Sequence, residues 1–252
     1  MDNISELTDR QIKILKAIID DYIQSGNAIG SEFLEKKFKL GFSPATIRNE
    51  MVVLGKLGFI GKSHFSSGRV PTPKAFRLYI NSLLPKKTLS TSEEVSIKNE
   101  VWDFQDNTMR FLEETTAALA KKSKLLSVVF LDSGFRFYSG INNFLGMKEF
   151  EDFDASKDVF SYLENYTYWL KILHTMMESD SLEVQVLIGE DYLYQPLYVL
   201  GGVFCPIENK NFKGAIGVLG PCRIEYSSAM PLVTYTANIV REVLQKNDGK
   251  TK

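Results

Sequence analysis

The chain has 252 residues, of which 44% are hydrophobic and 24% are charged, and this composition indicates a globular protein with a real core in one large or two modest domains. No apolar run is long enough to span a bilayer and the N-terminus lacks the basic and apolar regions of a signal peptide, so we expect no membrane segment and a cytoplasmic protein. The net charge is −1, but residues 1–87 carry 14 Lys and Arg against 8 Asp and Glu, so a basic first third precedes an acidic remainder. This asymmetry suggests a nucleic-acid-binding domain followed by a domain that interacts with a partner.

Two helices are predicted at the start of the chain. Thr8 and Gln11 have the spacing of a capping box, and Gly26 is expected to end the helix that begins there. An apolar stripe with helical spacing lies between them, formed by Ile12, Leu15, Ile19 and Tyr22. A shorter helix is expected after Ser31. Its end carries three lysines that suit the helix dipole and could reach a DNA backbone, namely Lys36, Lys37 and Lys39.

A third helix is predicted from residue 44, with Ser43 as its N-cap and Pro44 at the first helical position. One stripe of this helix is apolar and should be buried, namely Ile47, Met51 and Leu54. The opposite face then presents small and polar residues, with Ala45, Asn49 and Lys56 outward and Thr46 and Arg48 at the edges. Low bulk, hydrogen-bond donors and a free helix N-terminus suit a recognition helix in a DNA major groove. An ordinary amphipathic surface helix is the alternative.

Two short strands joined by a loop are predicted over residues 59–72, which is the form of a wing. Arg69 follows Gly68 in this hairpin, and an arginine there can enter the minor groove or pair with phosphate. His64 can also bond phosphate, although a partly exposed hairpin histidine is an equal alternative. Lys74 opens the next helix and is counted with the DNA-binding residues. A helix, a short helix, a turn, a polar helix and a wing together predict a winged helix-turn-helix domain over residues 1–85.

The middle of the chain begins with a polar linker, residues 86–92. One long helix is predicted over residues 93–122, because apolar residues recur at three- and four-residue steps along two stripes. A helix that is apolar on two sides either packs in a core or pairs with a second copy of the chain, and both readings stay open. We therefore treat residues 86–122 as a linker with a connecting or dimerisation helix.

Strands and helices mix in residues 123–252 without a strict βαβ repeat. Strands are predicted over residues 125–131, 135–139, 183–188, 197–207 and 213–219, and helices over residues 156–178 and 231–245. This order favours an antiparallel or mixed sheet with flanking helices, so the overall fold class is α+β.

The residue patterns of catalysis and cofactor binding are missing from the sequence. No phosphate-binding glycine loop and no nucleophile elbow is present, and the adjacent carboxylates diverge from each other. Cys205 and Cys222, with His64 and His174, do not have the spacing of a zinc site. We expect neither an enzyme nor a cofactor or metal site.

Several stretches of the sequence resemble the HrcA family of bacterial heat-inducible transcription repressors. They are LTDRQIKIL (7–15), GFSPATIRNEM (41–51), SGRVPT (67–72), GAIGVLGP (214–221) and PLVTYTA (231–237). The resemblance implies a winged helix-turn-helix domain followed by a GAF-like mixed α/β domain over residues 123–252. It also implies a homodimeric, nucleoid-associated repressor that binds an inverted-repeat operator in double-stranded DNA upstream of chaperone operons, with activity modulated by the chaperonin.

The resemblance also assigns DNA-binding residues by motif. These are Ser43, Ala45, Thr46, Arg48 and Asn49 on the third helix and Ser67, Gly68 and Arg69 in the wing. The chain is shorter than typical family members in its middle, which leaves the geometry of a dimer open. Two alternatives remain: a metabolite-sensing winged-helix regulator, since GAF-like folds often hold small ligands, and a protein-interaction module that does not bind DNA.

Overall fold

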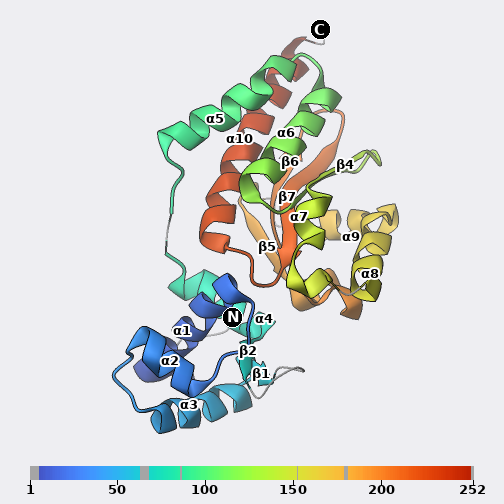
Figure 1. The fold of residues 1–252 in the computed structure, drawn as a ribbon. Coiled ribbons are helices and arrows are strands. Elements are labelled where there is room, and N and C mark those ends of the chain that lie inside the picture. The colour runs from blue at the N-terminus through green and yellow to red at the C-terminus, as the bar shows by residue number, and fades with distance from the viewer. Residues whose placement is uncertain (1–5, 63–67, 86, 152, 179–180, 251–252) are drawn as a thin grey trace. The chain divides into compact units, whose positions relative to one another are not determined.

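The computed structural model describes residues 6–62, 68–85, 87–151, 153–178 and 181–250, and the chain divides into two compact units, Met1–Pro85 and Lys86–Lys252 (Figure 1). Each unit has its own hydrophobic core and is described by itself. Within the described ranges, no helix has both the length and the apolar character that crossing a bilayer requires.

The first unit is a small helical domain with a β-hairpin. Its described elements run in the order α1 (Asp9–Ser25), α2 (Ser31–Phe38), α3 (Pro44–Lys56), β1 (Ile60–Lys62), β2 (Arg69–Pro71) and α4 (Pro73–Leu78), which a π-helical turn over Tyr79–Leu83 continues. The two strands are antiparallel, and Ile29 adds a third short segment through two backbone hydrogen bonds of 2.9 Å with Arg69. This is the predicted winged helix-turn-helix arrangement.

Local sequence signals define where these helices begin and end. The Thr8 hydroxyl accepts from the Gln11 N–H at 3.3 Å, and the Thr8 N–H donates to the Gln11 side chain at 2.9 Å, so the predicted capping box is present. Gly26 ends α1 in the left-handed conformation, with φ 61°. The Ser43 hydroxyl accepts from the Thr46 N–H at 3.2 Å, as expected of the N-cap of α3.

The core of the first unit is made by one apolar stripe from each helix together with the hairpin. Fully buried members are Ile14, Ile18, Leu34, Ile47, Leu54, Phe59 and Phe76. The predicted stripe of α3 is therefore confirmed for Ile47 and Leu54, and Met51 is also buried. This packing sets which side of α3 remains exposed.

The second unit is built on a five-stranded antiparallel sheet in the order β4-β3-β7-β6-β5. Its strands are β3 (Leu126–Leu131), β4 (Arg136–Ser139), β5 (Gln185–Ile188), β6 (Leu200–Glu208) and β7 (Lys213–Pro221). Its α-helices are α5 (Thr91–Val101), α6 (Thr108–Ser123), α7 (Ile141–Leu145), α8 (Phe153–Leu163), α9 (Tyr166–Met177) and α10 (Tyr226–Lys250). Of the two predicted sheet types, the structure has the antiparallel one.

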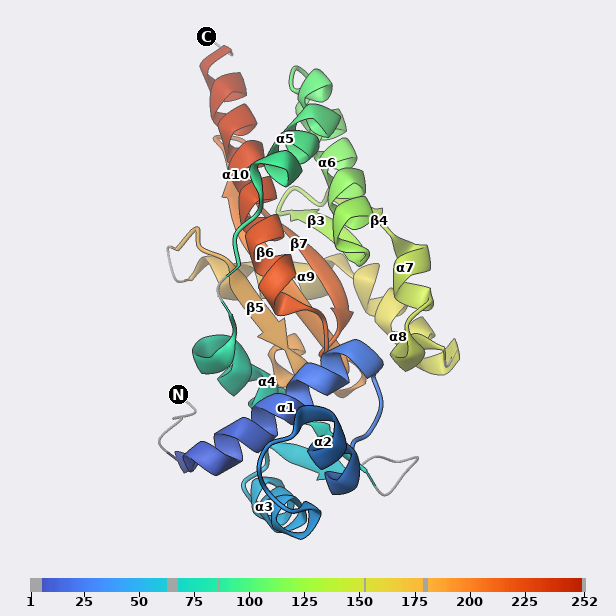
Figure 2. The same ribbon diagram turned by 60° about the vertical axis from the view of Figure 1, so that its left-hand side comes forward.

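Helices cover both faces of this sheet. Helices α6 and α10 pack on one face, and α7, α8 and α9 lie over the other (Figures 1 and 2). Alternate residues of β3 show the division: Val128 and Phe130 face the α9 side, whereas Val129 is buried on the other side. The result is a three-layer domain.

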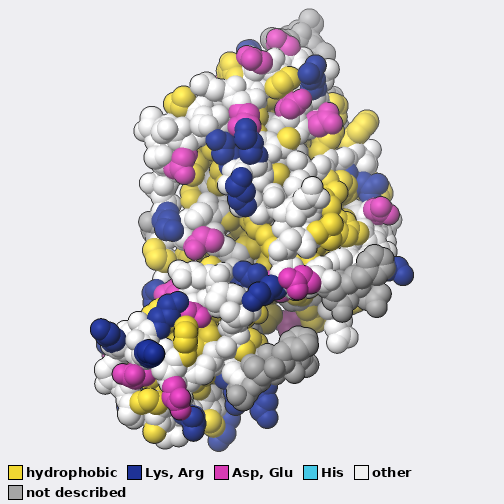
Figure 3. Space-filling view, in the orientation of Figure 1, with side chains coloured by type: hydrophobic (Ala, Val, Ile, Leu, Met, Phe, Trp, Pro, Cys, Tyr) yellow, Lys and Arg dark blue, Asp and Glu magenta, His cyan; other side chains and the backbone are white. Residues whose placement is uncertain are grey.

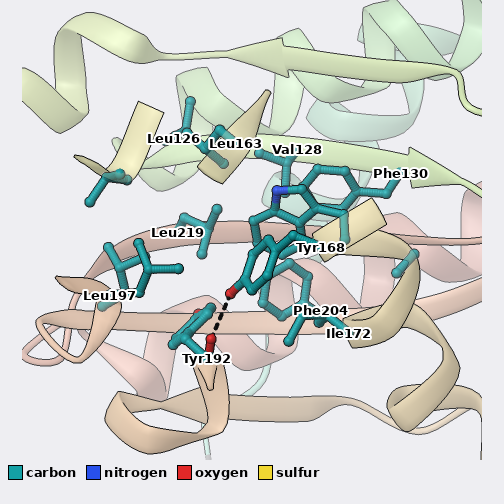
Figure 4. Packing of buried hydrophobic residues seen from close by; sticks show 14 of the residues in the cluster. Leu126, Val128, Phe130, Leu163, Tyr168, Ile172, Tyr192, Leu197, Phe204 and Leu219 are labelled. Atoms are coloured by element: carbon teal, nitrogen blue, oxygen red, sulfur yellow. Dashed lines mark hydrogen bonds between the residues drawn. The ribbon is translucent and has the colours of Figure 1, made fainter. Parts of the chain in front are cut away.

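Aromatic rings fill the layer between the sheet and α9 (Figure 4). Phe130 stacks on Trp169 with ring centroids 4.0 Å apart, and the Tyr168 hydroxyl donates to the Tyr192 carbonyl at 3.0 Å. Gly202 of β6 leaves room for the side chains of Tyr192 and Phe204, because a Cβ there would lie 2.4 Å from the Tyr192 hydroxyl and 2.6 Å from the Phe204 ring. The glycines of β6 and β7 that pair between these strands lie in a regular antiparallel register.

The predicted long connecting helix over residues 93–122 is wrong, because two helices replace it. Helix α5 ends at Val101, a 3₁₀ turn follows over Trp102–Phe104, and Asn107 caps α6 by accepting from the Arg110 N–H at 3.1 Å. The two helices form a hairpin in which the Lys121 ammonium contacts the Glu100 carboxylate at 2.6 Å. Within the second unit both apolar stripes are buried along most of their length, but Trp102, Phe104 and Met109 near the turn are only partly buried, which the uninterrupted periodicity of the sequence did not show.

Two other helix predictions also need correction. The predicted helix over residues 156–178 divides into α8 and α9, and the Asn165 side chain caps α9 by accepting from the Tyr168 N–H at 3.0 Å. The last helix was predicted to begin at Pro231, a residue that favours a first turn. Instead α10 begins at Tyr226 and contains Pro231 in its second turn.

Candidate nucleic-acid interface

The exposed face of α3 carries most of the residues that the sequence assigned to DNA. Ala45, Arg48 and Asn49 are exposed, so they are open to a partner. Ser43 and Thr46 are already engaged with each other: their hydroxyl oxygens are 2.9 Å apart, and Ser43 also caps the helix. These two residues therefore order the first turn of α3, whereas the other three present their side chains outward.

A buried carboxylate fixes the rotation of α3 about its axis. Glu50 lies on the buried side of the helix, where its side chain accepts from the Gln11 amide at 2.9 Å and forms an ion pair with Arg10 of α1. The pairing holds α3 against α1 with directed bonds as well as apolar contact. Sequence reasoning missed Glu50. The available signal was its position beside Met51 on the apolar stripe, because a charge on a buried stripe requires a partner.

The wing side of the interface starts at Gly68. A Cβ on Gly68 would lie 2.8 Å from the Ala28 carbonyl carbon, so glycine permits the backbone of residues 28–29 to approach β2. Arg69 is the first residue of β2 and is half-buried, and its guanidinium donates to the Gly68 carbonyl at 3.4 Å. Ser67 and His64 lie outside the described residues. Glycine at position 68 thus admits the neighbouring strand segment, and its assignment to DNA stays a prediction.

Arg48 and Arg69 face the same surface hollow. This hollow of about 420 Å³ lies between the start of α2, the middle of α3 and β2, and Gly30, Val52 and Gly68 also line it. The Arg48 side chain is 71% exposed and lies 3.8 Å from the Glu32 carboxylate. The hollow therefore brings two arginines from separate elements to one place, which the sequence did not predict.

Lys74 is held at the opposite end of α3. Its ammonium donates to the Leu57 carbonyl at 3.2 Å, just past the helix C-terminus, and lies 4.5 Å from the centre of the Phe59 ring. A cation there suits the negative end of the helix dipole. The structure thus gives Lys74 a local partner and separates it from the residues at the α3 N-terminus. Its assignment to DNA stays a prediction.

Basic side chains of the first unit are spread over its surface. In the view of Figure 3, Lys and Arg lie among acidic side chains. Lys37 is not free for a partner, because it forms an ion pair with Asp21, which is buried. Lys36 and Lys39 at the end of α2 remain exposed. Electrostatic attraction to a polyanion would therefore come from scattered lysines together with Arg48 and Arg69, the two arginines that line the hollow.

One small hollow lies beside the aromatic core of the second unit. The hollow that Phe130, Arg136 and Trp169 line has no room for a water-sized molecule. Throughout the described ranges, no group of three or more His, Cys, Asp or Glu side chains is placed to hold a metal ion. Cys205 is buried, and this burial raises the pKa of its thiol.

A capped α3 with an exposed polar face, held by α1 and α2 and followed by a hairpin, defines a winged helix-turn-helix protein. The chain belongs to the HrcA family. The family model described as "HrcA protein C terminal domain" matches residues 71–230, and the one described as "Winged helix-turn-helix transcription repressor, HrcA DNA-binding" matches residues 6–83. The resemblance found in the sequence is therefore confirmed.

Curated relatives support the same family. The heat-inducible transcription repressor HrcA of Clostridium tetani (strain Massachusetts / E88) is 42% identical over 136 residues, which are 54% of this chain and 39% of that protein. The protein of the same name from Thermobifida fusca (strain YX) is 39% identical over 126 residues, which are 48% of this chain and 37% of that protein. The matches to these relatives thus span about two fifths of their length.

One solved structure has the same fold. A crystal structure of a hypothetical protein at 2.2 Å resolution superposes with a TM-score of 0.72 at 15% sequence identity, and the match covers 96% of this chain and 99% of that one. Identity at this level shows the fold alone.

Proposed function

We propose that this chain is a sequence-specific DNA-binding repressor of chaperone operons, which binds an inverted-repeat operator as a homodimer and is modulated by the chaperonin. The observation that carries the proposal is the exposed N-terminal face of α3, which Glu50 and the buried stripe hold in a fixed rotation. The names of the curated relatives, heat-inducible transcription repressors, support the regulatory part.

The residues of α3 divide the work of recognition between bases and backbone. Asn49 carries an amide that can pair bidentately with adenine in the major groove, and Ala45 is small enough to let the helix approach. Arg48 and Arg69 line one hollow beside this face and are suited to DNA phosphates. Phosphate contacts then position the helix, and the outward face discriminates between sequences.

The second unit would supply the dimer and the regulation. We propose a GAF-like fold for it, supported by the five-stranded antiparallel sheet with helices on both faces. A two-fold dimer would place two copies of α3 on the two halves of an inverted repeat. Within the family resemblance, the chaperonin is the protein partner that sets repressor activity, and the protein acts in the cytoplasm on the nucleoid.

The test is a binding titration of the purified full chain on a duplex that contains the inverted repeat of a chaperone promoter, with a scrambled duplex beside it. Binding should prefer the repeat, weaken as salt is raised from low to physiological concentration, and change when chaperonin is added. No retention on either duplex at low salt would refute DNA binding and favour a protein-interaction module instead. An unchanged titration with chaperonin would refute the modulation alone.

An alanine variant of Arg48 tests whether this residue contacts phosphate or a base edge. Arg48→Ala should weaken binding to both duplexes similarly and reduce the salt dependence by about one phosphate contact, because a phosphate contact acts on every sequence. Arg110→Ala is the matched control: Arg110 is 62% exposed and lies 3.9 Å from Glu114, but it belongs to the second unit. A loss of about 1–3 kcal/mol for Arg48→Ala confined to the inverted repeat would instead assign it to a base edge.

A further inference from the structure

Two exposed valines lie next to each other on α3. Val52 is 48% exposed and Val53 is 39% exposed, although the residues before and after them are buried. Valine is a weak choice for an exposed helix position, because its branched side chain loses rotamer freedom there and gains nothing from burial. An exposed apolar residue that breaks the local preference on a binding face is a candidate for a contact made only in the complex.

The two valines occupy different sides of the interface. Val52 follows Ala45 by seven residues, or about two turns, and follows Asn49 by three, so these side chains share the outward face. Val52 also lines the hollow that contains Arg48. Val53 instead follows Thr46 by seven residues and lies on the flank of the helix. Val53 also neighbours Asn49, four residues earlier, but Val52 lies nearer the centre of the outward face and lines the hollow, so Val52 is the valine that continues the surface assigned to base recognition.

We propose that Val52 contacts the methyl group of a thymine in the major groove and acts as a specificity-determining residue. This inference rests on the proposed DNA-binding function. The thymine methyl is the apolar group that the major groove presents, and an aliphatic side chain is its natural partner. Neutral Ala45 and Val52 form the apolar part of the outward face, and the two arginines beside it carry the charge that a DNA backbone attracts.

The proposal predicts the order in which the contacted bases lie along the major groove. Ala45 and Asn49 lie in the first half of α3, nearest its N-terminus, and Val52 lies one turn further toward the C-terminus. A thymine read by Val52 should therefore be displaced along the groove from the base read by Asn49. In a dimer the same contact occurs once in each half of the repeat.

The experiment uses the duplex that the purified full chain selects from a pool of random sequences. Each thymine of that duplex is replaced singly by deoxyuridine, which removes the methyl group and leaves base pairing intact. At one thymine per half-site, the wild-type chain should bind about fourfold more weakly, because burying one methyl group contributes about 0.8 kcal/mol. Val52→Ala removes the contact from both half-sites of a dimer, so it should lose about fifteenfold on the thymine duplex, and it should show no further loss with deoxyuridine at that position.

Val53→Ala is the matched control, since it makes the same change one residue away and should keep the wild-type response to deoxyuridine. Both variants replace an exposed valine by a better helix former, so both should fold, and thermal unfolding of each checks this. The inference is overturned if no thymine is sensitive in the wild type, if Val52→Ala responds to every deoxyuridine as the wild type does, or if both variants lose the response alike. Failure to select any duplex refutes the DNA-binding function itself, and the inference is rejected with it.

Discussion

Replacing Glu50 by alanine should loosen α3 from α1 without unfolding the second unit. The substitution removes the acceptor of the buried Gln11 amide and the ionic partner of Arg10. Arg10 is 49% exposed and can be hydrated, so most of the cost comes from the Gln11 amide, whose partner is lost. Leaving a buried donor unsatisfied costs about 1–3 kcal/mol, and we expect about 2 kcal/mol for Glu50→Ala. Glu50→Gln keeps an oxygen for Gln11 and should cost about half as much.

Amide hydrogen exchange of the peptides that cover α3 is the suitable assay. A loss of about 2 kcal/mol makes exchange through local opening about thirtyfold faster. Tryptophan fluorescence provides an internal control, because Trp102 and Trp169 both lie in the second unit and should show an unchanged transition in urea. On DNA, Glu50→Ala should weaken binding to the inverted repeat even though it makes the chain more positive.

The proposed positioning role of Glu50 fails if exchange in α3 is not faster in Glu50→Ala than in the wild type, or if Glu50→Gln is as damaging as the alanine variant. It also fails if either variant binds the inverted repeat more tightly. That result would mean that the carboxylate acts only as a repelling charge and does not position the helix.

Two further predictions follow from contacts elsewhere in the chain. Glu32→Gln should raise DNA affinity about two- to fivefold in a low-salt titration, because it removes a carboxylate beside Arg48. The change should leave thermal stability within about 0.5 kcal/mol of the wild type, since exposed ion pairs contribute little. Weaker binding would contradict the assignment of Arg48 to phosphate. Tyr192→Phe should raise the stability of the second unit by about 1 kcal/mol in urea unfolding, because the buried Tyr192 hydroxyl has no hydrogen-bond partner among the described residues, and a loss of stability would show that this group is satisfied.

The first unit was largely predictable from the sequence because its signals are local. The capping box at Thr8, the stop at Gly26 and the cap at Ser43 each involve residues within one helical turn, so short-range spacing identifies them. The buried stripe of α3 followed from periodicity alone. These features were enough to define the face that carries Ala45 and Asn49.

The second unit was harder because tertiary packing overrides periodicity there. The apolar spacing continues through residues 102–107, yet α5 and α6 fold back on each other at that point. Only Asn107 signalled the start of a new helix, as Asn165 did between α8 and α9, and a single asparagine is weak evidence inside a long apolar pattern.

The candidate site was missed where its residues depend on distant segments. Glutamate is a residue type that usually lies on the surface, and the burial of Glu50 depends on Gln11, which lies 39 residues earlier. Val52 was not singled out in the sequence, because an apolar residue in a helix is usually part of a buried face, and the structure shows that it is exposed. The meeting of Arg48 and Arg69 in one hollow depends on the bridge between Ile29 and β2.

The close approach of two rings to Gly202 restricts how this sequence can change over generations. A side chain at position 202 would meet Tyr192, Phe204 and then Leu219 at 3.1 Å, and all three obstacles are side chains. Position 202 therefore becomes open to alanine only after Tyr192 has lost its hydroxyl and the Phe204 ring has been exchanged for a smaller residue. Reversing that order passes through an intermediate that packs poorly. The three positions should thus behave as one epistatic group, with a preferred sequence of substitutions in any lineage that repacks this layer.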